Sequence, residues 1–416
     1  MEKDSKIFFY KGMDNVLEKE EKDNRSPLEK IKDSFAKVLD GKNLSFLLGS
    51  GCSSFVVDRK EIGIPTMRLL ATEFYKKTLP TEHGEWLNSK LKLDISNDHF
   101  SKNIENFLGA LHSLYFYFQS TSQECSADGI RLNYIIEITR NFFIEKCLNE
   151  INRKANKDID LLILYQSFYR KLLYRNSNLP KPSIFTTNYD LYSEVALDKL
   201  GIHYVNGFSG GIKKYFNPTI FNYALAERMD LSQSKWSVID NFFYLYKIHG
   251  SINWVQDNEE SKLFKVREIQ ETEYDLLAKM ETVMIHPTPL KQNASLGSPY
   301  SELFREFQKK LMQNNNVLVT IGYSFSDEHI NNLIYQAFTI PSFRLIVLGD
   351  PSSASEIEKL RSLNDPRIWI IGGELDSENK LHYFKGFVDG VLPDLSNDEI
   401  DSKIENAIRT LLGKNE

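Results

Sequence analysis

The sequence predicts an α/β fold in which a parallel sheet is interrupted by a helical insertion. Two observations support this prediction. Short apolar runs recur along the chain as continuous stretches rather than alternating ones, which is typical of strands covered by helices on both faces of a parallel sheet. Between residues 67 and 180, apolar residues instead recur at helical spacing, and no clear strand interrupts them.

Seven stretches are predicted as strands. They are residues 44–48, 183–187, 244–248, 282–286, 317–321, 343–348 and 367–371. Because most of them are continuous apolar runs, we expect strands that are buried on both faces. The insertion between the first two, at about residues 67–180, is rich in Phe and Tyr, and we expect these aromatic residues in its core rather than around a cofactor.

The ends of the chain differ from this central part. Residues 1–33 are predicted as a charged segment, a solvated helix or a flexible lead-in rather than a binding tail. Within it, Ser26 and Pro27 predict the start of an amphipathic helix, as its N-cap and its first turn. Residues 34–350 are predicted as the main domain, and residues 351–416 as a strand and a last helix that complete or flank the sheet.

Composition excludes several classes of protein. The formal charge is −6 and the pI about 5.9, so no basic excess suggests nucleic acid as a direct ligand. Three scattered cysteines give neither a disulfide framework nor a zinc-binding pair. The N-terminus lacks the apolar core of a signal peptide, and no apolar run reaches the roughly 18 residues of a membrane helix, so we expect a cytoplasmic protein.

The first motif is LSFLLGSGCSSF, in which an apolar run stops at Gly49 and Gly51. Glycines at this point let a backbone approach a pyrophosphate, and a following helix N-terminus would face it. Alone the signal is weak, because a hydride-transfer fingerprint has a third glycine, where this chain has Ser54, and an acid about 20 residues later.

The second motif is IFTTNYD, in which a predicted strand runs into Thr187, Asn188 and Asp190. Ligands bind at the carboxyl ends of parallel strands. Asn offers a donor and an acceptor, and Asp190 could accept from a hydroxyl or hold Asn188. Taken alone, these residues are better explained by an Asx-type turn before the next helix.

The third motif is YLYKIHGSINW, in which a strand ends at His249 beside Gly250 and Ser251. A histidine at a strand end is well suited to proton transfer, although a structural histidine is the competing interpretation. In the fourth, VLVTIGYSFSDEHI, small residues at Gly322 and Ser324 could admit a ribose or a pyrophosphate.

Each motif follows a predicted strand, so all four would converge at one edge of a sheet. Their order resembles the sirtuin family: Gly-Ser-Gly-Cys-Ser, then Gly-Ile-Pro, Thr-Thr-Asn-Tyr-Asp, His-Gly-Ser and Gly-Tyr-Ser. The stretches NGFSGGIKKYFNP and IGYSFSDEHIN resemble the bacterial sirtuin-like domains of anti-phage defence. The resemblance spans about residues 44–350 and implies a Rossmann-like, NAD-binding fold with an inserted subdomain.

Two departures set this chain apart from deacylating sirtuins. Its scattered cysteines cannot build their four-cysteine zinc module, and no Phe-Gly-Glu-type segment is present for pairing with an acyl-lysine peptide. The resemblance to the defence branch therefore implies hydrolysis of NAD to nicotinamide and ADP-ribose, with no metal. A non-catalytic NAD or ADP-ribose sensor and, less favoured, a deacylase remain alternatives.

The resemblance also implies roles for single residues. His249 would be the general base, Asn188 would orient the nicotinamide ribose and the water, and Asp190 would support Asn188 or contact a ribose hydroxyl. The residues expected to bind the dinucleotide are Gly49, Ser50, Gly51, Cys52, Ser53, Thr187, Gly250, Ser251, Gly322 and Ser324.

Partners follow from the same resemblance. A stand-alone NAD hydrolase of this kind implies a separately encoded regulator, such as a HerA-type ring ATPase or, alternatively, a short Argonaute. We also expect a homo-oligomer. The charged segment 11–33 and the aromatic helices of residues 100–180 are the candidate contact surfaces.

Overall fold

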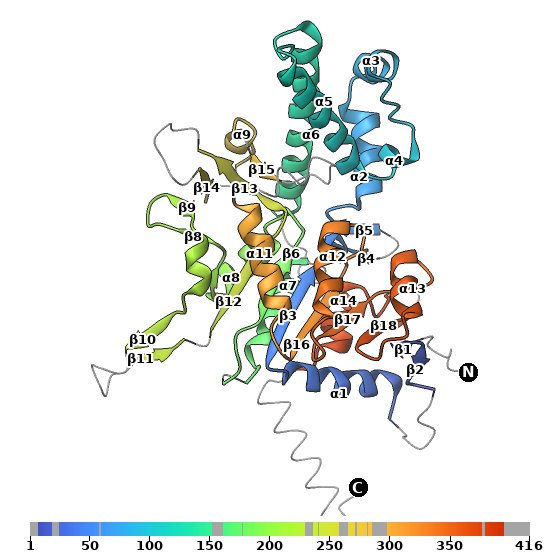
Figure 1. Ribbon diagram of the computed structural model, residues 1–416, viewed down its shortest axis with the longest axis vertical. Coiled ribbons are helices and arrows are strands. Elements are labelled where there is room, and N and C mark those ends of the chain that lie inside the picture. Colours follow the sequence, from blue (N-terminus) through green and yellow to red (C-terminus); the bar gives the residue numbers. More distant parts are fainter. Residues whose placement is uncertain are drawn as a thin grey trace, which may run out of the picture.

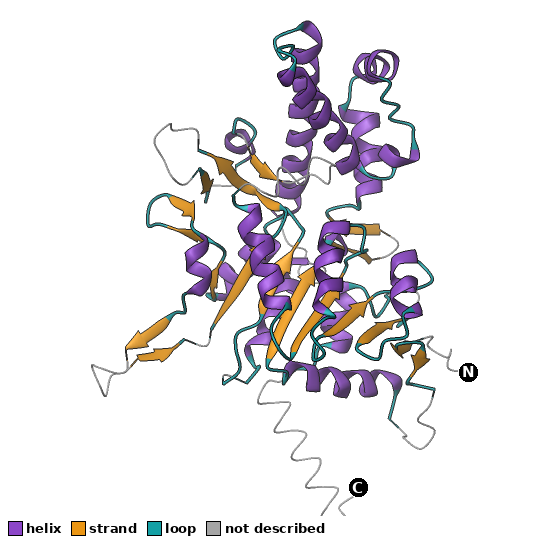
Figure 2. Cartoon of the chain, viewed as in Figure 1, coloured by secondary structure: helices purple, strands orange, loops and turns teal. Residues whose placement is uncertain are grey.

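The structure is a computed structural model. It describes residues 7–18, 25–57, 60–151, 161–176, 178–228, 236–239, 241–257, 265–270, 273–280, 282–284, 298–376 and 379–394. A large, mostly parallel sheet lies in the middle of the molecule with helices on both faces (Figure 1, Figure 2). The expected α/β fold is confirmed.

The central sheet has the order β2-β1-β18-β17-β16-β3-β6-β12-β7. Its strands are β1 (Phe8–Lys11), β2 (Asp14–Asn15), β3 (Asn43–Leu48), β6 (Ser183–Thr186), β7 (His203–Val205), β12 (Phe242–Lys247), β16 (Asn316–Ile321), β17 (Arg344–Leu348) and β18 (Ile368–Gly372). All neighbours from β18 to β7 are parallel. Without β7, the parallel strands have the order of a doubly wound Rossmann sheet, which reverses between β3 and β16.

The two faces of the sheet explain the continuous apolar runs. Phe46 and Leu48 of β3 point to the face covered by α1 (Pro27–Leu39), α7 (Leu161–Leu173), α8 (Tyr192–Leu200) and α14 (Phe384–Gly386). Leu47 points to the other face, covered by α11 (Tyr300–Leu311), α12 (Glu328–Ala337) and α13 (Ser355–Ser362). Side chains alternate along a strand, so burial of both faces favours apolar residues at successive positions.

The predicted helical stretch rises from the carboxyl ends of the strands (Figure 1). It contains α2 (Met67–Glu73), a π-helical turn (Phe74–Thr78), α3 (Thr81–Leu91), α4 (Asp98–Ser101), α5 (Ile104–Ser120) and α6 (Ala127–Ile151). These elements enclose a separate core that includes Phe74, Phe107 and Phe142, as expected for the aromatic residues. Helix α7 differs, because its Phe168 and Tyr169 pack on the sheet.

The N-terminal segment contributes more than a charged lead-in. Strand β1 pairs antiparallel with β18, and Phe9 is buried in the core beneath it. The predicted helix start is confirmed: the Ser26 hydroxyl accepts from the Glu29 N–H, the Glu29 carboxylate accepts from the Ser26 N–H, and Pro27 occupies the first position.

A second sheet lies beside the first and has the order β15-β13-β14-β9-β8. Its strands are β8 (Phe208–Ser209), β9 (Lys214–Phe216), β13 (Gly250–Gln256), β14 (Val266–Glu268) and β15 (Thr282–Met284), all antiparallel. The stretch 282–286 therefore forms a strand as predicted, but outside the parallel sheet, and its last two residues lie outside the described part. A short apolar run indicates burial and does not specify the direction of its partner.

The remaining elements are short. They are the hairpins β4 (Ser54–Val57) with β5 (Lys60–Gly63) and β10 (Ala226–Arg228) with β11 (Trp236–Val238), helix α9 (Tyr274–Leu277), 3-10 turns at Ser50–Cys52 and Pro218–Asn222, and a π-helical turn at Phe387–Val391. Strand β18 completes the sheet, while the last predicted helix lies beyond the described residues. Within the described ranges, no helix is both long and apolar enough to span a membrane.

Candidate functional site

A cavity of about 490 Å³ lies at the carboxyl edge of the central sheet. Its lower wall comes from the loops that follow β3, β6, β12 and β16, which are adjacent strands. Its upper wall comes from the helical region, with Thr66, Arg68, Lys102, Glu105 and Cys147 among its residues. The site therefore includes the point where the strand order reverses, which is where doubly wound sheets bind ligands.

The four sequence motifs converge at this cavity, as their positions after strands predicted. Of the predicted residues, those that line it are Ser50, Ser53, Thr187, Asn188, Asp190, His249, Gly322 and Ser324. Those that do not line it are Gly49, Gly51, Cys52, Gly250 and Ser251. The second set has structural explanations.

The two glycines of the first motif allow two loops to touch. A Cβ on Gly49 would lie 2.4 Å from the carbonyl oxygen of Gly322, and one on Gly51 would lie 2.8 Å from the Cα of Gly322. The N–H of Gly51 also donates to that carbonyl at 3.0 Å. Gly322 itself has φ +61°, a conformation that favours glycine. The need for small residues here arises from loop packing, and contact with a phosphate stays a prediction.

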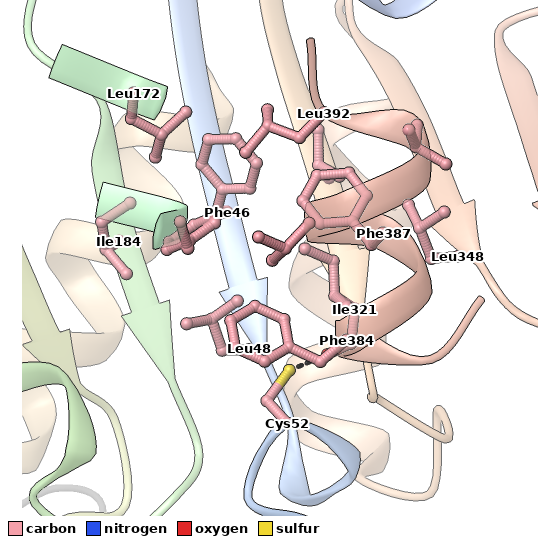
Figure 3. Packing of buried hydrophobic residues seen from close by; sticks show 14 of the residues in the cluster. Phe46, Leu48, Cys52, Leu172, Ile184, Ile321, Leu348, Phe384, Phe387 and Leu392 are labelled. Atoms are coloured by element: carbon pink, nitrogen blue, oxygen red, sulfur yellow. Dashed lines mark hydrogen bonds between the residues drawn. The ribbon is translucent and has the colours of Figure 1, made fainter. Parts of the chain in front are cut away.

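Cys52 belongs to the core rather than to the cavity. Its thiol points among Leu48, Ile321 and Phe384 and donates to the carbonyl of Ile321 at 3.2 Å (Figure 3). Burial, reinforced by the carboxylate of Asp190, raises the pKa of this thiol well above its ordinary value. The thiol of Cys52 therefore points away from the cavity, and contact of this residue with the dinucleotide stays a prediction.

Ser53 joins the first two motifs. Its hydroxyl donates to Oδ2 of Asp190 at 2.6 Å and accepts from Nδ2 of Asn188 at 2.9 Å. Nδ2 of Asn188 also donates to the carbonyl of Gly49 at 2.9 Å. All three side chains are buried, so this network fixes the orientation of two polar groups at the cavity wall.

Asp190 also fits the Asx-type turn considered for this motif. Its Oδ1 accepts from the N–H of Tyr192, the first residue of α8, at 3.1 Å. One carboxylate oxygen therefore serves the turn while the other serves the Ser53 network. The Asx-type turn is therefore present, and contact of Asp190 with a ligand stays a prediction.

His249 faces a carboxylate that the sequence analysis did not assign to the site. Its Nε2 lies 3.1 Å from Oδ2 of Asp327, and both side chains are largely buried. The other oxygen of Asp327 accepts from the N–H groups of His329 and Ile330 and so caps α12. A carboxylate in this position orients an imidazole and stabilises its protonated form.

The residues that flank His249 shape its strand. Gly250 has φ +87° where the chain turns into β13, and the hydroxyl of Ser251 donates to the carbonyl of Tyr189 at 3.3 Å. Both residues therefore shape the backbone, and contact with a ligand stays a prediction. His329 lies outside the cavity and packs edge-on against Phe304, so its contacts in the structure are structural.

The sequence analysis missed the upper wall and Asp327. Asp327 follows a buried strand in the pattern Ser-Asp-Glu-His, which indicates the start of a helix and not a chemical role. Glu105 of α5 hydrogen-bonds to Tyr189, and burial together with this carboxylate raises the pKa of that phenol well above its ordinary value. No local pattern indicates such a contact, because its partners come from different regions of the fold.

No group of three or more His, Cys, Asp or Glu side chains that could hold a metal ion occurs among the residues described. In comparison with known families, the model described as the SIR2-like domain matches residues 182–369. No curated protein matches the chain. The match runs from the start of β6 into β18 and includes Asn188, Asp190, His249 and Asp327. Residues 182–369 are therefore similar to a sirtuin-like domain and lie within a Rossmann-like fold, and SIR2-like domains use NAD.

Proposed function

We propose that the chain hydrolyses NAD⁺ to nicotinamide and ADP-ribose in this cavity. The observation that carries the proposal is the contact of 3.1 Å between Nε2 of His249 and Oδ2 of Asp327, beside the buried network of Asn188, Ser53 and Asp190. A proton acceptor and a set of oriented polar groups thus share one cavity. The volume of about 490 Å³ is within the range of roughly 300–1,000 Å³ that is usual for ligand pockets.

The reaction needs one bond to break and one to form. The bond between C1′ of the ribose and the nicotinamide nitrogen breaks, and its electron pair leaves with nicotinamide. Through an oxocarbenium-like transition state, water attacks C1′ and gives its proton to His249. Asp327 stabilises the resulting imidazolium. The products are nicotinamide, ADP-ribose and a proton.

The polar walls suit the rest of the substrate. Asn188 can orient the nicotinamide ribose and the water, while Asp190 holds Asn188 through Ser53 or accepts from a ribose hydroxyl. Arg68 and Lys102 line the upper wall and supply positive charge for the pyrophosphate.

The test is release of nicotinamide from NAD⁺ by the purified chain. His249→Ala should lower kcat by about 10²- to 10⁴-fold, the usual effect of losing a positioned acid–base group. His203→Ala is the matched control, because His203 lies exposed on β7 and away from the cavity. Undiminished hydrolysis by the His249 variant would overturn its assignment as the base. Binding of NAD⁺ without any cleavage would favour the sensor alternative. Turnover of an acetyl-lysine substrate would favour the deacylase alternative.

The wider role is proposed from the resemblance of the motifs to bacterial defence proteins. In that role the chain depletes NAD as the effector of an anti-phage system, as a homo-oligomer controlled by a HerA-type ATPase or, alternatively, a short Argonaute. Phe116 and Tyr117 of α5 are more than half exposed, which supports the helical region as a contact surface. Cleavage of NAD⁺ with and without the partner, together with the mass of the particle in solution, tests this role.

A further inference from the structure

A buried lysine lies directly beneath the candidate site. Lys247 is the last residue of β12, two residues before His249, and its side chain is 1% exposed. Its ammonium lies 3.0 Å from Oε1 of Glu194 on α8 and donates to the carbonyl of Tyr189 at 3.3 Å and to that of Asp190. An ammonium has three donors, and these three acceptors occupy them.

A contribution to folding stability does not by itself explain why Lys247 and Glu194 are buried as a pair. Moving two charges out of water carries a large desolvation penalty, and a buried ion pair is often no more stabilising than an apolar pair of similar volume. Burial raises the pKa of Glu194, and the adjacent Lys247 opposes that shift. The burial of Lys247 is better explained by its hydrogen bonds, because its ammonium donates to the backbone of the loop after β6.

That loop carries the polar groups of the site. The carbonyl of Tyr189 also accepts from the hydroxyl of Ser251 and from the N–H of Ile252 at 3.1 Å. It is therefore held from three sides, between the residues whose side chains, Asn188 and Asp190, meet at Ser53.

We propose that Lys247 is a positioning residue of the site, whose ammonium fixes the carbonyls of Tyr189 and Asp190 and thereby the orientation of the Asn188 and Asp190 side chains. Glu194 balances the charge of the ammonium without holding the loop itself. The catalytic consequence of this inference rests on the proposed NAD⁺ hydrolysis, whereas the structural consequence does not.

The test compares three variants of the full chain. Lys247→Met removes the ammonium but keeps an unbranched side chain. The double variant Lys247→Met with Glu194→Gln also removes the carboxylate that would otherwise stay buried without its cation, so that folding is preserved. Glu194→Gln alone leaves the ammonium and both of its bonds to carbonyl groups.

The matched control is Lys171→Met. Lys171 of α7 also donates to two carbonyls, those of Val388 at 2.8 Å and Leu392 at 3.2 Å, but it does not line or support the cavity. Its loss therefore imitates the structural change at a site remote from the chemistry. Thermal unfolding of all variants shows which of them are folded at the assay temperature.

For nicotinamide release, kcat should fall by about 10²-fold in both Lys247 variants with little change in KM, because misplaced groups affect the transition state more than binding. Glu194→Gln and Lys171→Met should keep kcat close to the wild-type value. An equal loss in Glu194→Gln or in Lys171→Met would overturn the proposal, since either would show that general destabilisation causes the effect.

Hydrogen exchange gives a readout that does not depend on activity. The N–H groups of Asn188 and Tyr192 donate to Thr186 Oγ1 and Asp190 Oδ1 within this loop. Their exchange should accelerate by about tenfold or more in the Lys247 variants and stay unchanged in Lys171→Met. If the wild-type chain fails to cleave NAD⁺ both alone and with the HerA-type ATPase or the short Argonaute, the proposed function is wrong, while this measurement still decides the role of Lys247. Unchanged exchange in a folded Lys247 variant would refute it.

Discussion

Two neighbouring loops at the edge of the sheet were both expected to bind the ligand. Their residues make different kinds of contact in the structure. The loop after β3 contributes glycines that pack against the loop after β16, and a cysteine that points into the core. The loop after β6 contributes Asn188 and Asp190, whose polar groups meet at the cavity wall. The two loops are joined by the hydroxyl of Ser53, which bonds to Asn188 and Asp190, and by the carbonyl of Gly49, which accepts from Asn188.

The difference shows what each kind of residue reveals in a sequence. A glycine at a strand end indicates that something approaches the backbone closely, and that neighbour can be another loop as readily as a phosphate. A buried polar side chain must find a partner, so a cluster of them indicates a built network. The comparison predicts that changes in the second loop affect activity, whereas changes in the first affect stability.

Among changes in these two loops, the largest effect is expected for Asn188→Ala. This change removes the donor to Gly49 and Ser53 and the group proposed to orient the ribose and the water. Loss of one preorganised polar group of this kind lowers kcat by about 10²- to 10³-fold. Steady-state nicotinamide release measures it.

The control for this variant is Asn253→Ala. Asn253 is also buried, in β13, and donates to the carbonyl of Ile269 at 3.1 Å without lining the cavity. It should lose stability in thermal unfolding but keep its kcat. Equal kcat losses in the Asn188 and Asn253 variants would contradict a specific role of the loop after β6 in activity.

A smaller effect, on stability, is expected for Gly49→Ala. The added methyl group would overlap the carbonyl of Gly322, and such overpacking costs about 2–3 kcal/mol. Gly211→Ala is the control, because an added Cβ there meets no atom within 4 Å. Urea unfolding measures both. Full stability of the Gly49 variant together with a raised KM for NAD⁺ would instead favour direct contact with the dinucleotide.

The smallest effect is expected for Cys52→Ala. The change removes a buried thiol and its hydrogen bond to Ile321, and we expect it to cost about 1 kcal/mol of unfolding free energy. KM for NAD⁺ should not change, because the thiol points away from the cavity. A marked rise in KM in a folded variant would restore Cys52 to the binding site.

Much of the fold could be predicted from local patterns. Each of the seven predicted strands coincides with a strand, because a buried strand is apolar along its whole length and ends at polar or small residues. Helix α1 was predictable from Ser26 and Pro27, which act locally on the first turn. The convergence of the four motifs followed from the rule that parallel strands end at one edge.

Other features depended on distant partners. Strand β1 lies in a charged segment. It joins the central sheet because it pairs with β18, which lies far away in the sequence. The stretch 282–284 has a strand's composition, yet its antiparallel partner β13 decides which sheet it joins. Neither pairing leaves a signal in the residues themselves.

The sequence by itself determined the α/β class, the strand ends and the polar residues Asn188, Asp190 and His249, because apolar runs and the polar groups that follow them are local properties. The tertiary structure alone decided that Asp327 faces His249, that Lys247 holds the loop beneath Asn188, and that Gly49 packs on Gly322. These contacts join residues from different strand ends, and their distances are set by the order in which the strands assemble.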